Sequence, residues 1–302
     1  MILPERYRDS IGKALQSFRH NGQFMLARRM ERTVINRQGF EFTVESTVTL
    51  AGEGEDAFFS IFLHDISERK KVERMKNEFV STVSHELRTP LTSIHASLSM
   101  LDGGMAGNLP PDAARLVAIA SQSCDRLMRM VNDLLDIQKI EAGHMEYQRT
   151  AQLLAPLMHH VADAMEGQAR QAGVTLRLDM PPGAEWVQAE IDHDRMVQVL
   201  TNLVSNAIKF TPGGKDVILG LAQRPGWARL SVTDEGPGIP PAFQSRVFER
   251  FAQADAADSR QRSGSGLGLS ISKAIVEEHG GSIAFETRAG AGTRFTVELP
   301  LA

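Results

Sequence analysis

The sequence predicts a multidomain protein that combines a small α/β segment, an α-helical hairpin forming a dimeric four-helix bundle, and an α+β sandwich. Three observations support this fold class. Alternating β-prone runs fill the first part of the chain, apolar residues then recur at helical spacing through two long segments, and short strand and helix patterns alternate after them. We therefore expect three domains, at residues 1–67, 68–148 and 149–302.

Composition narrows the class of protein. With 42% apolar and 23% charged residues and a net charge of −4, the chain has an ordinary globular composition that argues against nucleic-acid binding. No apolar run approaches the roughly 18 residues of a membrane span, and the N-terminus lacks the apolar core of a signal peptide. Cys124 is the only cysteine, so no internal disulfide is expected, and its apolar neighbours predict burial. We expect a cytoplasmic protein with no membrane span in this chain.

The first segment reads as a helix followed by three strands. Residues 6–18 have a helical pattern that ends at the turn Asn21-Gly22. Residues 28–35 and 40–50 alternate apolar and polar side chains and are joined across a glycine, which is typical of a hairpin. Residues 57–65 complete a small sheet.

Two long amphipathic helices are expected next. The first runs from residue 68 to 101, and the second from about residue 112 to 140. The loop between them is short, so the two helices form an antiparallel hairpin. One hairpin cannot bury both apolar stripes, and we therefore predict a homodimer. The first stripe consists of Val72, Met75, Phe79, Val83, Leu87, Leu91, Ile94, Leu98 and Leu101.

His85 and Glu86 stand side by side in the first of these helices. At about 100° per residue, His85 lies roughly 200° from Val83, on the opposite side from the apolar stripe. A lone histidine on a helix is most often an ordinary surface residue, and Thr89 stands where the second histidine of a zinc-binding H-E-x-x-H motif would be. Pro90 favours a functional role, because proline inside a helix costs about 3 kcal/mol or more.

The remainder of the chain predicts an α+β sandwich with helices on one face of a sheet. Its strand patterns lie at residues 174–178, 186–190, 217–222, 229–234, 281–285 and 294–299. Its helical patterns lie at residues 153–171, 194–210 and 270–279. We predict that the connection at residues 143–153 acts as a hinge between the hairpin and this domain.

Two glycine-bearing loops and one helix within this domain suggest a nucleotide site. The loop D-E-G-P-G-I at residues 234–239 follows an apolar strand, and G-S-G-L-G-L at residues 264–269 leads into a helix. Glycines before a helix N-terminus let backbone N–H groups approach a phosphate chain. Asn202 and Asn206 share a helix face with Lys209 one turn further on, and amide oxygens suit Mg²⁺. Each element alone is weak evidence, but together they predict a nucleotide site that can hold Mg²⁺.

The motifs together resemble those of sensor histidine kinases of bacterial two-component systems. H-E-L-R-T-P-L resembles the H box of the HisKA dimerisation and phospho-acceptor domain. N-L-V-S-N-A-I-K, D-E-G-P-G-I, F-E-R-F and G-S-G-L-G-L-S-I resemble, in family order, the boxes of a GHKL-type ATP-binding domain. The resemblance covers roughly residues 68–300. The preceding R-Q-G-F-E-F-T-V-E and H-D-I-S-E-R-K resemble the second half of a PAS sensor domain, so we expect a partial PAS-like segment.

The resemblance implies roles for individual residues. His85 is the phospho-acceptor, Glu86 is its general base, and Thr89 orients a water that dephosphorylates the response regulator. Asn206 binds Mg²⁺, Asn202 and Lys209 lie near the phosphates of ATP, and Asp234 accepts a hydrogen bond from the adenine amino group. The remaining residues implied in the nucleotide site are Gly236, Gly238, Arg260, Gly264, Gly266, Leu267, Gly268 and Thr293. Gln253 stands where many members carry an arginine.

The implied function is autophosphorylation of His85 from Mg-ATP, followed by transfer to an aspartate in the receiver domain of a response regulator. The same motif around Glu86 implies that the protein also dephosphorylates that regulator. Two alternatives stay open on the residues alone. One is a different ATPase of the same superfamily, such as a chaperone, topoisomerase or mismatch-repair type, and the other is a scaffold that binds nucleotide or regulator without transfer.

Overall fold

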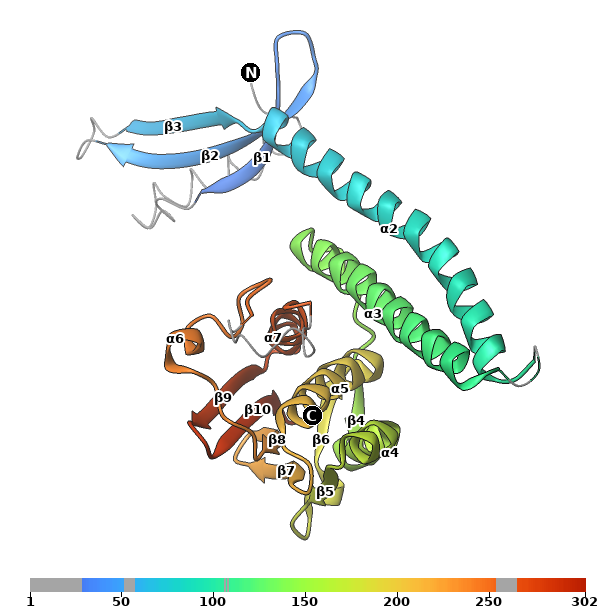
Figure 1. Ribbon diagram of the computed structural model, residues 1–302. Coiled ribbons are helices and arrows are strands. Elements are labelled where there is room, and N and C mark those ends of the chain that lie inside the picture. Colours follow the sequence, from blue (N-terminus) through green and yellow to red (C-terminus); the bar gives the residue numbers. More distant parts are fainter. Residues whose placement is uncertain (1–28, 52–57, 106, 108, 254–264) are drawn as a thin grey trace. The chain divides into compact units, whose positions relative to one another are not determined.

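The computed structural model describes residues 29–51, 58–105, 107, 109–253 and 265–302 (Figure 1). The chain divides into two compact units, Met1–Thr82 and Val83–Ala302, and each is taken by itself. Within the described part of the chain, no helix has both the length and the apolarity that crossing a membrane requires.

The first unit contains a three-stranded antiparallel sheet in the order β1-β2-β3. The three expected strands are confirmed, whereas the expected helix at residues 6–18 lies outside the described residues. The turn between β1 and β2 is held by the Asn36 side chain, whose Oδ1 accepts the N–H groups of Gln38 and Phe40. The strands are β1 (Met30–Ile35), β2 (Glu41–Ala51) and β3 (Phe58–Asp65).

Helix α2 (Ser67–Asp102) follows the sheet and runs through both units. Its first turn is fixed to β3, because Asp65 Oδ1 accepts the Ser67 N–H at 2.9 Å. The helix continues through Pro90, which cannot donate a hydrogen bond to the carbonyl of Glu86. The single long helix predicted from the sequence is therefore confirmed, and the role of Pro90 as a bend stays a prediction.

In the second unit, α2 packs antiparallel to α3 (Pro111–Glu141) through a small apolar core of Leu91, Cys124 and Val131. Polar contacts flank that core: His95 meets Asp125 at 2.8 Å, and Arg88 donates to Asn132 at 3.0 Å. Cys124 is buried as expected, and its Sγ donates to the Leu91 carbonyl. Most of the predicted stripe stays exposed in the single chain, including Val83, Leu87 and Ile94.

The rest of the second unit is the expected α+β sandwich. Its five-stranded sheet has the order β5-β7-β8-β10-β9, with β5 and β7 parallel and the other neighbours antiparallel. The buried side chains of β7, β8 and β10 alternate along each strand, so one face of the sheet is fully covered. The strands are β5 (Thr175–Asp179), β7 (Asp216–Arg224), β8 (Trp227–Asp234), β9 (Ser282–Arg288) and β10 (Gly292–Pro300).

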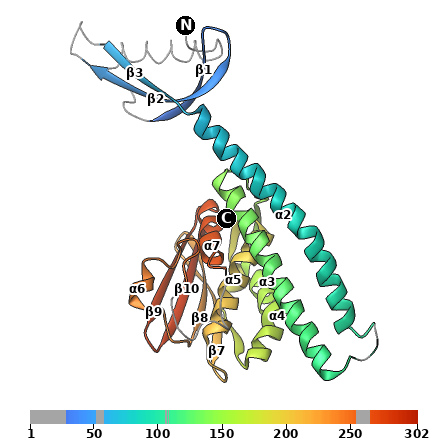
Figure 2. The same cartoon turned by 45° about the horizontal axis from the view of Figure 1, so that its top comes forward.

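Three helices cover that face of the sheet (Figures 1 and 2). They are α4 (Leu154–Ala172), α5 (His193–Phe210) and α7 (Gly268–Glu278), and their apolar sides contribute many of the fully buried residues of the domain. Ile137 of α3 also belongs to this core, so the hairpin and the sandwich share packing.

Three short elements of the domain differ from the sequence expectation. The strand predicted at residues 186–190 begins as a 3₁₀ turn at Ala184–Trp186 and becomes β6 only at Gln188–Ile191. β6 pairs with β4 (Thr150–Leu153) in a separate two-stranded sheet. Neither β4 nor α6 (Pro241–Gln244) was expected, because four residues are too few to show a period.

Candidate functional site

The candidate nucleotide site is built where α5 meets the start of α7. Asn202 of α5 lies against Gly268, the first residue of α7, so closely that a Cβ on this glycine would overlap the asparagine amide. The Asn202 Nδ2 also donates to Ser272 Oγ at 3.0 Å. The structure therefore brings together two predicted residues that are 66 positions apart, and it adds Ser272, which the sequence did not single out.

Asn206 and Lys209 continue the same face of α5 toward its C-terminus. Asn206 is half-buried and makes no side-chain hydrogen bond to another described residue. Lys209 lies in the last turn, with its Nζ 4.8 Å from the centre of the Phe210 ring. A neutral amide oxygen at this position has the chemistry of an Mg²⁺ ligand, so the residue fits the metal that the motif implies.

Asp234 ends β8 and is held by backbone groups from two segments. Its Oδ1 accepts the Gly236 N–H at 2.8 Å and the Thr293 N–H at 3.2 Å, because Thr293 is its partner in the β8–β10 register. Burial raises the pKa of Asp234, and the two N–H groups oppose this rise. With both of these bonds on Oδ1, the second carboxylate oxygen can accept a hydrogen bond from a ligand.

The glycines around Asp234 are required by close backbone approach. Gly238 has φ +76°, and a Cβ there would lie 2.5 Å from the Arg288 carbonyl oxygen. Gly292 has φ +90°, and a Cβ there would overlap the Asp234 backbone. Gly292 could not be predicted as a site residue, since a glycine in G-A-G before a strand is typical of an ordinary turn.

The second glycine loop packs against the end of the F-E-R-F motif at residues 248–251. A Cβ on Gly266, which has φ +72°, would lie 2.9 Å from the backbone carbon of Phe251. Phe251 itself adopts φ 58°, a left-handed backbone conformation that residues other than glycine rarely adopt. Leu267 of this loop is buried, whereas Gly264 and Arg260, which were also predicted as site residues, lie outside the described residues.

One face of α3 makes polar contacts with the nucleotide domain. Ser265 Oγ donates to Asp133 Oδ2 at 2.8 Å, and Gln198 Nε2 donates to Asp136 Oδ2 at 2.7 Å. Arg250 pairs with Glu141 at the end of the same helix. Burial raises the pKa of Asp133, and the bond from Ser265 partly offsets this rise. No local sequence pattern predicts these contacts.

A buried histidine fixes the connection after α3 to the same domain. His279, after the end of α7, accepts the Asp192 N–H at Nε2 (2.9 Å) and therefore donates from Nδ1 to the Ile275 carbonyl (2.7 Å). The Tyr147 ring meets it edge-on at 5.4 Å, and Asp192 Oδ2 accepts the Gln148 N–H. Burial lowers the pKa of His279, so the imidazole is held neutral.

The H-box residues all lie within α2, as predicted. His85 stands one turn before Pro90, and the direction of its side chain stays a prediction. Glu86 and Thr89 are exposed on the helix. Their place on an accessible helix is compatible with both a phospho-acceptor and a docking role, and their roles stay predictions.

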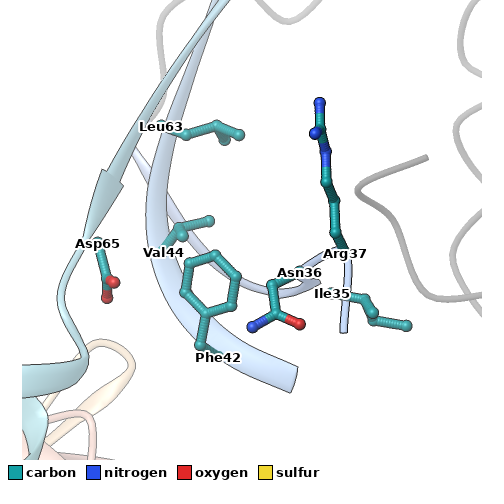
Figure 3. Close-up of a pocket in the computed structure, with 7 residues that line it drawn as sticks. All are labelled: Ile35, Asn36, Arg37, Phe42, Val44, Leu63 and Asp65. Atoms are coloured by element: carbon teal, nitrogen blue, oxygen red, sulfur yellow. The ribbon is translucent and has the colours of Figure 1, made fainter. Parts of the chain in front are cut away.

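The first unit contains a hollow of about 560 Å³ on its sheet (Figure 3). Two of its polar side chains are already occupied by local bonds, since Asn36 caps the β1–β2 turn and Asp65 caps α2. We assign this hollow no ligand. It is lined by Ile35, Asn36, Arg37, Phe42, Val44, Leu63 and Asp65.

Comparison with known protein families agrees with this arrangement. The model of the His Kinase A (phospho-acceptor) domain matches residues 75–143, which include the H box. The model of the histidine kinase-, DNA gyrase B- and HSP90-like ATPase matches residues 191–302, which include Asn202, Asp234 and Gly268. The chain belongs to the sensor histidine kinase family. The helical hairpin and the GHKL-type domain expected from the sequence are confirmed, and the PAS-like segment stays a prediction.

Individual histidine kinases are similar over most of the chain. Sensor protein kinase WalK of Staphylococcus aureus is 33% identical over 283 residues, which cover 93% of this chain and 66% of that protein. The protein of the same name from strain JH9 has the same identity, and 45% of its length is covered. The chain thus spans roughly half to two thirds of the length of these relatives.

One solved structure, that of full-length ShkA, agrees with this assignment. Full-length ShkA in complex with AMPPNP is 30% identical and has a TM-score of 0.61, covering 74% of this chain and 46% of ShkA. The catalytic domain of histidine kinase ThkA is 32% identical over 52% of this chain and 96% of that domain, with a TM-score of 0.45.

Proposed function

We propose that this chain is a sensor histidine kinase that moves the γ-phosphoryl group of Mg-ATP to His85 and then to an aspartate of a response regulator. It acts as a homodimer in the cytoplasm, where ATP and regulators are available. The observation that carries the proposal is that the Asn202–Gly268 contact and the backbone-held Asp234 lie in one domain, which follows a helical hairpin that carries the H box.

ATP is held at both of its ends. Asp234, fixed through Oδ1 by two backbone N–H groups, accepts the hydrogen bond of the adenine amino group through its other oxygen. The N-terminus of α7, with Gly266, Leu267 and Gly268, lies close to the phosphate chain, where its N–H groups and dipole favour negative charge. The complex of ShkA with AMPPNP supports a triphosphate as the ligand of this domain class.

Asn206 supplies the amide oxygen for Mg²⁺, and Asn202 and Lys209 stand on the same helix face beside the phosphates. A metal held there would supply positive charge that offsets the negative charge developing on the phosphate oxygens during transfer. The protein contributes mainly positioning, which is what phosphoryl transfer requires.

The transfer exchanges one bond for another. The bond from the γ-phosphorus to the bridging oxygen of ADP breaks as a bond to an imidazole nitrogen of His85 forms. Glu86 orients the ring and increases the nucleophilicity of the attacking nitrogen as general base. In the second step the phosphoryl group passes from the imidazole nitrogen to a carboxylate oxygen of the regulator.

The same helix is proposed to support removal of the phosphoryl group from the response regulator. Thr89 lies one turn after Glu86 and is exposed, so its hydroxyl can orient a water against the phospho-aspartate of a docked regulator. Dephosphorylation of the regulator is therefore the second proposed activity.

Radiolabelled ATP tests the kinase proposal. The purified chain should acquire a label that is stable to alkali and lost in acid, as expected for a phosphoramidate, and His85→Ala should abolish it. His95→Ala is the matched control, because it removes another histidine of α2 and should keep the label. ATP turnover without any such label would favour another ATPase of the superfamily, and nucleotide binding without turnover or label would favour a scaffold.

A further inference from the structure

One face of α3 docks on the nucleotide domain of the same chain. We call it the docking face: Asp133, Asp136, Ile137, Ile140 and Glu141, which recur at steps of three and one along the helix. Ile137 is only 5% exposed and packs in the core of the nucleotide domain. All three acidic members engage polar side chains of that domain, so the contact is specific as well as apolar.

The contact of Asp133 reaches the predicted phosphate loop. Ser265 has one hydroxyl proton, and it is donated to the Asp133 carboxylate, which only accepts. The same Ser265 oxygen accepts the Leu267 N–H at 3.2 Å. Leu267 immediately precedes Gly268, so this N–H is one of the donors at the start of α7.

A triphosphate needs the same groups. Its oxygens would accept from the N–H groups before α7, one of which is held by Ser265, and its charge would lie near the half-buried Asp133. Two negative groups close together in a partly buried site repel each other, and one N–H group cannot fully serve two acceptors. Docking of α3 and binding of the phosphate chain therefore oppose each other.

We infer that the Asp133–Ser265–Leu267 chain of hydrogen bonds is a nucleotide-sensitive latch between α3 and the phosphate loop. The inference rests on the proposed function, because it takes the triphosphate of ATP as the competing ligand. Binding of the triphosphate releases the docking face and leaves the nucleotide domain able to move toward the phospho-acceptor helix. By linkage, releasing the latch by mutation must tighten nucleotide binding.

Calorimetric binding of Mg-ATP to the full chain carrying His85→Ala, which prevents labelling, tests the latch. Asp133→Asn should bind at least about fivefold more tightly than its parent, the lower range of an allosteric coupling. Asp112→Asn, which makes the same charge change in the first turn of α3, should bind like its parent. Equal affinity of the Asp133→Asn and parent chains would overturn the latch.

A double-mutant cycle separates the latch from a general charge effect. In a Ser265→Ala background, Asp133→Asn should change the affinity much less than it does alone, because the connection to Leu267 is already broken. An undiminished effect would overturn the latch. Failure of the latch leaves labelling of His85 in the wild-type chain intact, whereas absence of Mg-ATP binding in the parent would overturn the latch and the proposed function together.

Discussion

The contact between Gly268 and Asn202 leaves no room for a Cβ on the glycine unless the asparagine amide moves. A Cβ on Gly268 would overlap the Asn202 amide and displace it from Ser272. We expect Gly268→Ala to weaken Mg-ATP binding by about tenfold or more. The displaced Asn202 amide would lose its proposed hydrogen bond to a phosphate oxygen of ATP, and a hydrogen bond to a charged group is usually worth that much. Calorimetry of the purified variant measures this.

Gly167→Ala is the matched control for that substitution. Gly167 lies inside α4, where an added Cβ meets nothing within 4 Å. The variant should bind Mg-ATP normally and gain roughly 0.5–1 kcal/mol in the free energy of unfolding, because alanine favours a helix over glycine. Normal Mg-ATP binding by Gly268→Ala would contradict the proposed role of Asn202 in nucleotide binding.

Residue types predicted only part of this site. Asn202, Asp234 and the glycines of both loops could be predicted as site residues because each sits in a local pattern of chemistry and spacing. Gly292 and Ser265 were missed, because their importance comes from partners 58 and 132 positions away, Asp234 and Asp133. No local pattern encodes such a contact.

The second half of the connection after α3 is held against the nucleotide domain. The Tyr147 ring packs on His279 and the Gln148 N–H donates to Asp192, so this part of the connection is bound to the nucleotide domain. The hinge predicted at residues 143–153 stays a prediction, and these contacts restrict it to residues 143–146. Gly143, with φ 64°, lies within this shorter hinge, and His144, Met145 and Glu146 border a hollow of about 440 Å³.

Low pH should weaken the contact between the connection after α3 and the nucleotide domain, because His279 becomes protonated. Its pKa is lowered by burial, and the neighbouring Arg149 opposes protonation whereas Asp192 and Glu278 favour it. The unfolded chain binds the proton near pH 6.5, before the folded chain does, so the stability present above that pH is lost as pH falls through the folded pKa.

Thermal unfolding followed by tryptophan fluorescence measures this loss, because both tryptophans, Trp186 and Trp227, lie in the nucleotide domain. The midpoint should fall between about pH 7.5 and 5.5, and the fall should be smaller in His279→Gln. His159→Gln, at an exposed position on α4, should behave like the wild type. An undiminished fall in His279→Gln would exclude this histidine as the cause.

Long helices, in which the apolar pattern repeats over many turns, were predicted well, whereas elements of four residues were not. The apolar steps of α2 and α3 extend over many turns, whereas β4 and α6 each have four residues. The strand order β5-β7-β8-β10-β9 was also beyond the sequence, since pairing depends on partners that are distant in the chain.

The apolar stripe of α2 is largely exposed in the single chain. Leu87 and Ile94 are 44% and 50% exposed in the single chain, and the predicted second copy would cover them. We expect Leu87→Lys to convert a dimer into a monomer, since burying an unpaired ammonium costs several kcal/mol.

Light scattering during size-exclusion chromatography measures the mass of each variant. Trp186→Lys is the control, because it places the same charge at a 74% exposed apolar residue of the nucleotide domain and should leave the dimer intact. A wild-type chain that is monomeric at high concentration would contradict the predicted bundle.

The central claim, that the nucleotide domain phosphorylates one particular histidine, is tested most directly by mapping the phosphoryl group. After incubation with Mg-ATP, mass spectrometry at alkaline pH should find the modification on His85 and on none of the other eight of the nine histidines. Asn206→Ala, which removes the proposed metal ligand, should abolish it. A phosphoryl group on another residue, or an undiminished amount in Asn206→Ala, would contradict the account.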